Sequence, residues 1–322
     1  MLEPLRVDGL GKHLEDRYGV AVAGVAPLDL GVFRVDRRDG SRWVARVFPA
    51  GRPLVGVEGD AAILRGLERA GFPAERCAHP EPVSEFLGQG VLVTGFLEDH
   101  GPLRPGRPAG LLGYMLGRLH KHPATDLRPG GAWHHLTFSG EPGDEIAAAT
   151  ELLEDHLPEV GVRELARFDR LRDEVARTDD CQDLPHAFVH PDFVPANAIS
   201  TAEGKLAIVD WTGAGRGPRL WSLGFLLLAA GARDLRLVDV VVSRYRRSIE
   251  LEPAELDRIE GAIRGRPVML EAWSVCAGRR ELAAAIERIE RVDDLAKSIA
   301  VVARRAFATR VGRSDRLPRV RR

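Results

Sequence analysis

Two short stretches, HAFVHPDFVPAN at residues 186–197 and LAIVDW at 206–211, decide the fold of this chain. Each contains an apolar run typical of a buried β-strand, which leads into Asp192 and Asn197 in the first stretch and Asp210 in the second. Strand ends hold side chains on rigid backbone, so we expect these three to point into one shared cleft. Such a group is suited to handling a proton and a divalent cation.

The spacing of these residues is typical of kinase-type phosphotransferases. Asp192 and Asn197 form a D-x-x-x-x-N pattern, and Asp210 follows 13 residues after Asn197. In such enzymes the first aspartate accepts the proton of the substrate hydroxyl, while the asparagine and the second aspartate hold Mg²⁺. The alternatives are turn chemistry for Asp192 and Asn197, and a helix N-cap for Asp210.

Through HPD at residues 190–192, Asn197 and VDW at 209–211, the chain resembles the aminoglycoside phosphotransferase and choline kinase family. The family pattern is H-G-D-x-x-x-x-N followed by I-D-W. The resemblance implies an α+β, bilobal protein-kinase-like fold, with a β-rich nucleotide-binding lobe at 1–98 and a mainly helical catalytic lobe at 99–322. HPD also occurs in J-type cochaperone domains, but those are short and all-helical, whereas this tripeptide follows a strand-like run.

The resemblance also implies an activity. The protein would be a Mg²⁺-dependent small-molecule kinase that moves the γ-phosphate of ATP or GTP to a hydroxyl, with Asp192 as the catalytic residue and Asn197 and Asp210 as metal ligands. His190 would support the loop by hydrogen bonding. His120, which closes an apolar helical run at 111–123, is expected to be a packed structural histidine.

Composition limits the other possibilities. The 322 residues are 44% hydrophobic and carry a net charge of -1, which argues against nucleic acid as the main partner. Three cysteines without metal-ligand spacing favour a reducing compartment. The longest apolar run, 220–232, is too short to span a membrane and predicts a buried helix. The first twenty residues indicate a charged helix and no export signal, so we expect a cytoplasmic protein. We expect it to be a monomer or a homodimer.

Residues 20–98 predict a small β-rich lobe. GVFRVDR and SRWVARVF flank Asp39-Gly40, a strong hairpin signal, and a second hairpin turns at Gly88 to Gly90. Between the hairpins, helical periodicity runs from about 57 to 70. Two hairpin strands, one helix and two further strands are the order that a kinase N-terminal lobe requires.

A basic residue on the third strand of a kinase holds the nucleotide phosphates and is fixed by a helix glutamate. No lysine occurs between Lys12 and Lys121, so the position falls to Arg46. Its guanidinium can bind phosphate oxygens in a fork, although a surface strand arginine is the alternative. Glu58, in the first turn of the following helix, is the predicted partner, with Glu68 as second choice.

The rest of the nucleotide site is predicted from position. Gly31, between the first two strands, offers a backbone amide for phosphate, although a simple β-turn explains it equally. The stretch VTGFLE at 93–98 falls where the hinge between lobes meets adenine, which makes Thr94 and Phe96 candidate nucleotide contacts. The alternative for this stretch is a strand end that leads into a loop.

Substrate class is predicted from charge. Residues 141–162 contain no lysine or arginine and seven carboxylates, Glu141, Asp144, Glu145, Glu151, Glu154, Asp155 and Glu159. Such a face attracts cations, so Asp155 is a candidate substrate ligand, and the resemblance adds Glu271. The first hypothesis is phosphorylation of an aminoglycoside-like antibiotic, hence resistance. The alternatives are a solvated amphipathic helix and a kinase of an amino alcohol or sugar metabolite.

Two positions depart from the family pattern. Pro191 replaces the usual glycine before the catalytic aspartate, which fixes φ and stiffens the loop. Ser222, in Trp221-Ser222-Leu223 after Gly217-Pro218, stands where the family carries an aspartate. We expect Ser222 to cap the following helix without supplying negative charge to the catalytic loop. A non-catalytic nucleotide-binding pseudokinase is therefore a further alternative.

Overall fold

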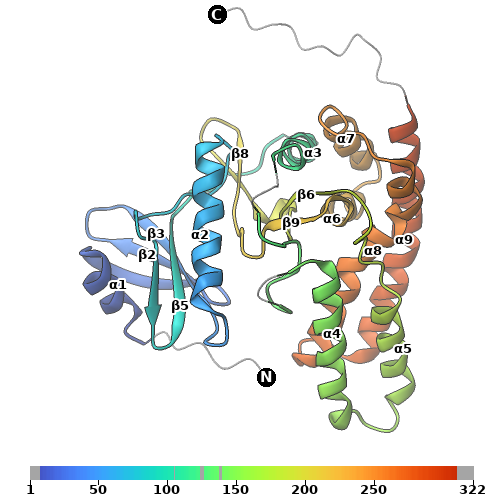
Figure 1. Ribbon diagram of the computed structural model, residues 1–322, viewed down its shortest axis with the longest axis horizontal. Coiled ribbons are helices and arrows are strands. Elements are labelled where there is room, and N and C mark those ends of the chain that lie inside the picture. Colours follow the sequence, from blue (N-terminus) through green and yellow to red (C-terminus); the bar gives the residue numbers. More distant parts are fainter. Residues whose placement is uncertain (1–7, 105, 124–126, 138–139, 310–322) are drawn as a thin grey trace, which may run out of the picture.

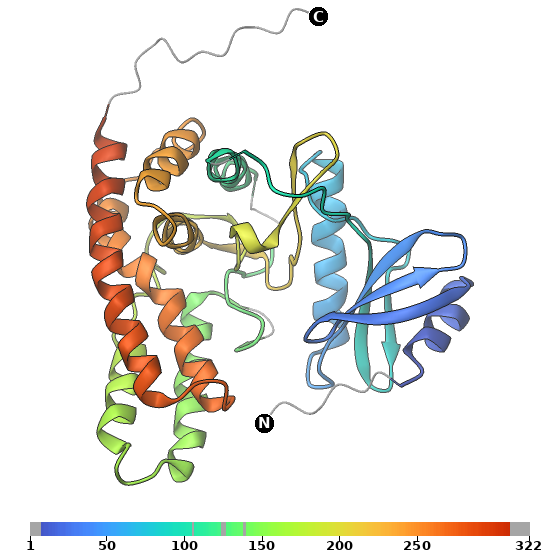
Figure 2. The ribbon, with the colours of Figure 1, turned by 180° about the vertical axis from the view of Figure 1, so that it is seen from behind.

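The computed structural model describes residues 8–104, 106–123, 127–137 and 140–309. A β-rich part lies beside a larger, mainly helical part, and the two are seen side by side from front and back (Figures 1 and 2). The predicted boundary at residue 98 lies in the connection from the last strand of the large sheet to the next helix. The order of elements is the predicted α+β arrangement.

The β-rich part is a five-stranded antiparallel sheet with strand order β1-β2-β3-β5-β4. Its strands are β1 (Val22–Asp29), β2 (Val32–Arg37), β3 (Arg42–Val47), β4 (Val83–Phe86) and β5 (Gln89–Gly95). Helix α1 (Leu10–Tyr18) packs on one face, and α2 (Leu54–Arg69) lies between the sheet and the helical part (Figure 1). Both predicted hairpins and the helix between them are confirmed.

Glycines close both hairpins. Gly40 has a φ of 84° between β2 and β3, and Gly88 has a φ of 76° between β4 and β5. Side chains are strained in this left-handed region, so glycine suits both turns. The β2–β3 register pairs Val32 with Arg46, which places Arg46 at the end of the sheet that carries the β1–β2 turn.

The helical part contains α3 (Arg107–His120), α4 (Pro142–His156), α5 (Leu165–Ala176), α6 (Arg219–Gly231), α7 (Arg236–Tyr245), α8 (Pro253–Cys276) and α9 (Leu282–Ala308). Short strands carry the predicted motif: β6 (His186–Val189) pairs with β9 (Gly215–Pro218), and β7 (Ala198–Ser200) pairs with β8 (Leu206–Ile208). Two 3₁₀ turns complete the order, at Leu157–Glu159 and Pro195–Asn197. Helix α6 is buried, as predicted. Among the described residues, no helix has the length and apolar character of a membrane span.

The segment after α2 joins the two parts. Pro73 accepts a hydrogen bond from the Ile208 amide at 2.9 Å, and the Glu75 amide donates to the Ile208 carbonyl at 3.0 Å. Residues 73–75 thus run along β8. The core of the helical part continues across this junction to α2. Glu75, which follows α2, therefore lies next to the segment that contains Asp210.

His120 is a packed structural residue, as predicted. It is buried at the end of α3, and its Nδ1 lies 2.9 Å from the Tyr245 hydroxyl. Burial disfavours the charged ring and, with a smaller effect of Arg219, lowers the pKa of His120 to about 3. Because the fold favours the neutral ring, His120 contributes stability at pH values above its ordinary pKa of 6.5. This contribution is lost as the pH falls toward the lowered pKa.

We predict that His120→Gln reduces the acid sensitivity of the fold. Between pH 7 and pH 5, His120 should lower the free energy of unfolding by about 2 kcal/mol. The unfolded chain binds a proton at this histidine over about 1.5 pH units of that range, whereas the buried ring stays neutral. Urea unfolding at both pH values measures the difference. The same change at the exposed His100 is the control. Equal pH dependence of wild type and His120→Gln would contradict the prediction.

Candidate active site

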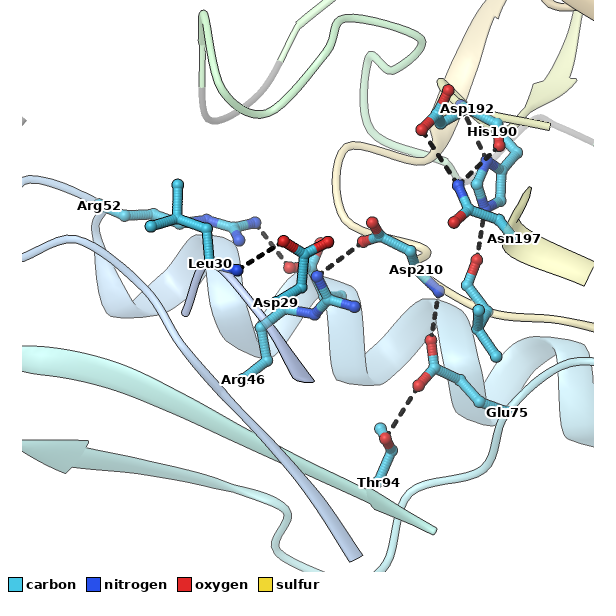
Figure 3. Close-up of polar contacts among 12 residues, drawn as sticks. Asp29, Leu30, Arg46, Arg52, Glu75, Thr94, His190, Asp192, Asn197 and Asp210 are labelled. Atoms are coloured by element: carbon cyan, nitrogen blue, oxygen red, sulfur yellow. Dashed lines mark hydrogen bonds and ion pairs between the residues drawn. The ribbon is translucent and has the colours of Figure 1, made fainter. Parts of the chain in front are cut away.

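The HPD stretch forms a loop held by hydrogen bonds from His190 and Asn197 (Figure 3). The His190 ring accepts the Asp192 amide at Nδ1 (2.9 Å), and its Nε2–H donates to the Val209 carbonyl (3.1 Å). These bonds fix a neutral tautomer, in agreement with a pKa that burial lowers to about 4. His190 therefore supports the loop, as predicted, and ties Asp192 to the chain just before Asp210.

Asn197 also joins the Asp192 loop to the segment before Asp210. Its side-chain Nδ2 donates to the Asp192 carboxylate at 3.1 Å and to the Asp192 carbonyl at 3.0 Å. Its own carbonyl accepts the Val209 amide at 3.0 Å. Asp192, Asn197 and the residue before Asp210 thus form one hydrogen-bonded unit, so the structure brings the three predicted residues together.

Asp210 has a φ of 65°, which is uncommon for a residue with a side chain. Its Oδ1 lies 2.9 Å from Nη1 of Arg46, an ion pair between the helical part and β3. Burial opposes ionisation, but Arg46 and, more weakly, His134, His190 and His135 lower the pKa of Asp210 to about 2. Asp210 is therefore an anion at neutral pH, beside the predicted phosphate-binding arginine.

Glu75 is a site residue that the sequence interpretation missed. It is buried, and its Oε1 accepts the Asp210 amide at 2.7 Å while its Oε2 accepts the Thr94 hydroxyl at 2.8 Å (Figure 3). These bonds hold the unusual backbone of Asp210 against β5. No local pattern marks Glu75, because its role depends on the pairing of residues 73–75 with β8.

The residues present fit a divalent cation bound with nucleotide. Asn197 uses its amide nitrogen on Asp192, which leaves its amide oxygen for a ligand, and Asp210 supplies an ionised carboxylate. Oxygen donors of this kind, together with phosphate oxygens and water, suit Mg²⁺. In the described part of the chain, no group of three or more His, Cys, Asp and Glu side chains forms a metal site.

The predicted partner of Arg46 is wrong. Glu58 is exposed and makes no ion pair with Arg46, and Glu68 is exposed with Arg76 3.8 Å away. The buried carboxylate of α2 is instead Asp60, which lies two residues, about 200° of helical turn, from Glu58.

Asp60 connects the two parts of the protein. It lies 2.6 Å from Nη2 of the buried Arg52 and also pairs with Arg128 of the helical part. Arg128 donates further to the Gly56 carbonyl at 2.8 Å. Thus α2 contributes a buried ionic contact between the two parts.

The predicted nucleotide contacts fall into different places. Gly31 lies in the turn from β1 to β2 with a φ of 72°, and its carbonyl accepts the Val47 amide at 2.8 Å. Thr94 is buried and turns its hydroxyl to Glu75, so that side chain is committed within the protein. Phe96 is half-buried, and its amide donates to the Arg42 carbonyl at 3.1 Å. Nucleotide contact by Gly31 and Phe96 stays a prediction.

The predicted substrate carboxylates lie apart or are paired. Asp155 is exposed in the last turn of α4, about 20 Å along the axis from its first residue. Figure 1 shows that end of α4 projecting beyond the rest of the helical part. Glu271 is buried and pairs with Arg280 at 2.6 Å and Arg288 at 2.9 Å. Neither carboxylate is presented to the Asp192 loop as a free anion.

Ser222 does not cap α6, contrary to expectation. The helix already begins at Arg219, so Ser222 lies within its first turn. Its hydroxyl donates to the His190 carbonyl at 3.0 Å, and the residue is buried. Ser222 therefore braces the catalytic loop through a neutral hydrogen bond.

A comparison with protein families now identifies the chain. Residues 29–259 match the model of the phosphotransferase enzyme family that includes the aminoglycoside phosphotransferases. The chain belongs to this family. The matched region contains the Arg46 strand, Glu75 and both halves of the catalytic motif, so this phosphotransferase is a small-molecule kinase by family. No curated protein sequence matches it.

Solved structures confirm the protein-kinase-like fold of this phosphotransferase. An amicoumacin kinase in complex with AMP-PNP, Ca²⁺ and Ami is 15% identical, with a TM-score of 0.63 over 90% of this chain and 92% of that one. An aminoglycoside phosphotransferase from Alicyclobacillus acidocaldarius is 13% identical, with a TM-score of 0.62 over 92% and 96%. A choline kinase from Streptococcus pneumoniae is 15% identical, with a TM-score of 0.61 over 90% and 98%.

We predict that Glu75 of this phosphotransferase positions Asp210. Glu75→Ala should lower the Mg²⁺-dependent affinity for nucleotide by about 10- to 100-fold, as for other supports of metal ligands. Glu75→Gln should stay near wild type, because its amide can accept from Asp210 and donate to Thr94. Nucleotide titrations with and without Mg²⁺ measure this, and Glu68→Ala is the control. Equal losses in the alanine and glutamine variants would contradict a positioning role.

Proposed function

We propose that this chain transfers the γ-phosphoryl group of ATP or GTP to a hydroxyl of a small molecule. The observation that carries the proposal is the single unit formed by Asp192, Asn197 and the Val209-Asp210 segment, joined by His190. In this unit the half-buried carboxylate of Asp192 contacts Asn197, and Asn197 and Asp210 would supply oxygen donors for a cation. Phosphoryl transfer rests on positioning and charge neutralisation, for which such a rigid unit is suited.

The proposed reaction is a direct transfer of one phosphoryl group from the nucleotide to the acceptor hydroxyl. The acceptor oxygen forms a bond to the γ-phosphorus, the bond from that phosphorus to the bridging oxygen breaks, and nucleoside diphosphate leaves. The acceptor proton passes to a carboxylate oxygen of Asp192, whose other oxygen is held by Asn197. Burial, together with the negative charge of Asp210, raises the pKa of Asp192, which makes it a better proton acceptor than an exposed aspartate.

Asn197 and Asp210 would hold Mg²⁺ bound with the nucleotide, and the ion would neutralise charge on the phosphates. Arg46 lies beside Asp210 and would contact the same phosphates. As an arginine it keeps its charge throughout and offers a planar fork of donors, unlike a lysine. Asp192 would remain available to the acceptor, because Asn197 holds only one oxygen of its carboxylate, Oδ2.

Two classes of acceptor molecule are candidates. An aminoglycoside-like antibiotic, and hence a resistance role in the cytoplasm, is the hypothesis drawn from the carboxylates at 141–162. Kinship with aminoglycoside phosphotransferases supports it. Local pairing weakens it, because Glu145 contacts Arg266, Glu154 contacts Arg172 and Glu159 contacts His156. An amino alcohol or sugar metabolite is the second candidate, supported by the likeness to a choline kinase.

The test is nucleoside diphosphate release with Mg-ATP and Mg-GTP. Acceptors are offered in separate pools of aminoglycosides, other antibiotics, amino alcohols and sugars, and the product phosphate ester is identified by ³¹P NMR. We expect turnover with one pool and none with the Asp192→Asn protein. Tight Mg-nucleotide binding without turnover in any pool, Pro191→Gly and Ser222→Asp variants included, would favour a pseudokinase instead.

A further inference from the structure

Four aromatic rings form a continuous cluster beside the catalytic motif. The aromatic cluster consists of Trp133, His134, His135 and Trp273. The His135 ring centre lies 4.1 Å from that of His134, 4.6 Å from that of Trp133 and 5.5 Å from that of Trp273, and the two indoles are 5.2 Å apart. Three of the residues come from the loop before α4 and Trp273 comes from α8. Trp133 is buried, while the others are half-buried.

The loop that carries the cluster is held against both catalytic segments. The Gly131 amide donates to the Gly213 carbonyl at 3.0 Å, three residues after Asp210. Gly213 has a φ of 79°, and a Cβ there would lie 2.7 Å from the Ala132 carbonyl oxygen and 3.5 Å from Pro191. Only glycine allows this approach. The cluster therefore adjoins the loop that presents Asp192.

The two histidines of the cluster are neutral rings at physiological pH. Burial lowers the pKa of His134 to about 3 and also lowers that of His135, while the Asp210 carboxylate acts weakly in the opposite direction on both. Neutral imidazoles and indoles offer flat faces and no net charge to a ligand.

The charge at the outer end of the cluster is positive. The guanidinium of the exposed Arg279 lies 4.5 Å from the centre of the Trp273 ring. The neighbouring carboxylate of Glu271 is neutralised by Arg280 and Arg288. Arg279 forms no ion pair among the described residues, so its charge at the Trp273 ring favours an anion over a polycation.

We propose that the aromatic cluster and Arg279 form an acceptor subsite for an alcohol that carries a planar ring and a negative group. The ring would stack on Trp273 and the histidines, the anion would pair with Arg279, and the hydroxyl would reach Asp192. The proposal rests on the proposed kinase function and sets its acceptor class apart from the polycationic one. Stacking and charge pairing use different groups of the subsite, so their contributions can be separated by matched ligands.

The test uses four probes with wild-type protein and Mg-ADP, and saturation-transfer NMR as the readout of binding. 3-Phenyllactate has ring, hydroxyl and carboxylate; 2-phenylethanol lacks the carboxylate; lactate lacks the ring; kanamycin is a polycation. We expect 3-phenyllactate to bind at least about tenfold more tightly than either fragment, since each fragment loses one of the two contacts. Kanamycin should not displace it.

Variants separate a ligand-binding role from a structural one. Arg279→Gln should weaken 3-phenyllactate about tenfold without affecting 2-phenylethanol, and Arg279→Glu should reverse the preference toward the cationic phenylalaninol. Arg279 is exposed, so these proteins should fold; Trp273→Leu, checked by thermal unfolding, should weaken both ring-bearing probes. Arg118→Gln is the matched control, because Arg118 also lies over an aromatic ring, that of the exposed Tyr114.

The outcomes keep this subsite distinct from the kinase assignment. Binding is read without turnover, whereas the kinase assignment depends on turnover that Asp192 supports. Tighter binding of kanamycin, no binding of 3-phenyllactate at about 10 mM, or an unchanged charge preference in Arg279→Glu overturns the subsite. Asp192-dependent turnover of a polycation would then retain the kinase and reject this acceptor class.

Discussion

Replacing Asp192 by asparagine is expected to lower kcat by roughly 10²- to 10⁴-fold while leaving Mg-nucleotide affinity nearly unchanged. The carboxylate accepts one hydrogen bond from Asn197 and offers its remaining oxygen to the acceptor. An asparagine can turn its amide oxygen to Asn197 and keep the loop in place, but its NH₂ cannot take a proton. The loss should therefore fall on the chemical step.

The stability of Asp192→Asn provides an internal check. Burial, together with Asp210, raises the pKa of Asp192, so the fold disfavours its charge. A neutral asparagine should leave the free energy of unfolding unchanged or slightly higher. Turnover, nucleotide affinity and urea unfolding are measured on the same protein, with Asp173→Asn on the exposed face of α5 as the control. Unchanged turnover in Asp192→Asn would refute its catalytic role.

Residues of the site that lie close in sequence could be predicted, because local rules fix them. Asp192 and Asn197 lie within one loop after β6, and Gly40 and Gly88 mark hairpins by their backbone freedom. Arg46 was predicted from the kinase pattern of a basic residue on the third strand, together with the absence of lysine between Lys12 and Lys121. For the loop and the hairpins, the structure depends on neighbours within a few positions along the chain.

Residues whose role depends on distant pairing could not be predicted. The sequence placed a carboxylate on α2, but helix rotation against the helical part decided between Glu58 and Asp60, and Arg128 is 68 residues from Asp60. Glu75 is 135 residues from Asp210, and the two meet through residues 73–75 on β8. Nothing in the local sequence distinguishes these carboxylates from solvated ones.

Counting charges was misleading for the same reason. The run of carboxylates at 141–162 suggested an anionic substrate face. Glu145 is nevertheless buried, with Oε2 3.2 Å from Nη2 of Arg266, and contributes no charge to such a face. Asp144 closes a capping box at the start of α4. A charged residue contributes to a surface field only after its partners are known, and those partners come from elsewhere in the chain.

Asp210→Ala is expected to remove the Mg²⁺-dependent part of nucleotide affinity, by about 100-fold or more. Loss of a mere support of a metal ligand typically costs 10- to 100-fold, and Asp210 is proposed as a ligand itself. Affinity for nucleotide without Mg²⁺ should persist or rise. The substitution frees Arg46 from its ion pair and removes one negative charge near the phosphates.

The opposite responses with and without Mg²⁺ separate a metal ligand from a structural anion. Asp210 has a pKa of about 2, so its ionised form stabilises the fold above the ordinary value of 3.8, and this stabilisation disappears as pH falls toward 2. Asp210→Ala should therefore also destabilise the protein at neutral pH, and Asp210→Asn, which retains the shape, keeps the test valid if the alanine variant unfolds. Nucleotide titrations at several Mg²⁺ concentrations decide the matter. An unaltered Mg²⁺ dependence in both variants would assign Asp210 to the support of Arg46 alone and remove it from the metal site.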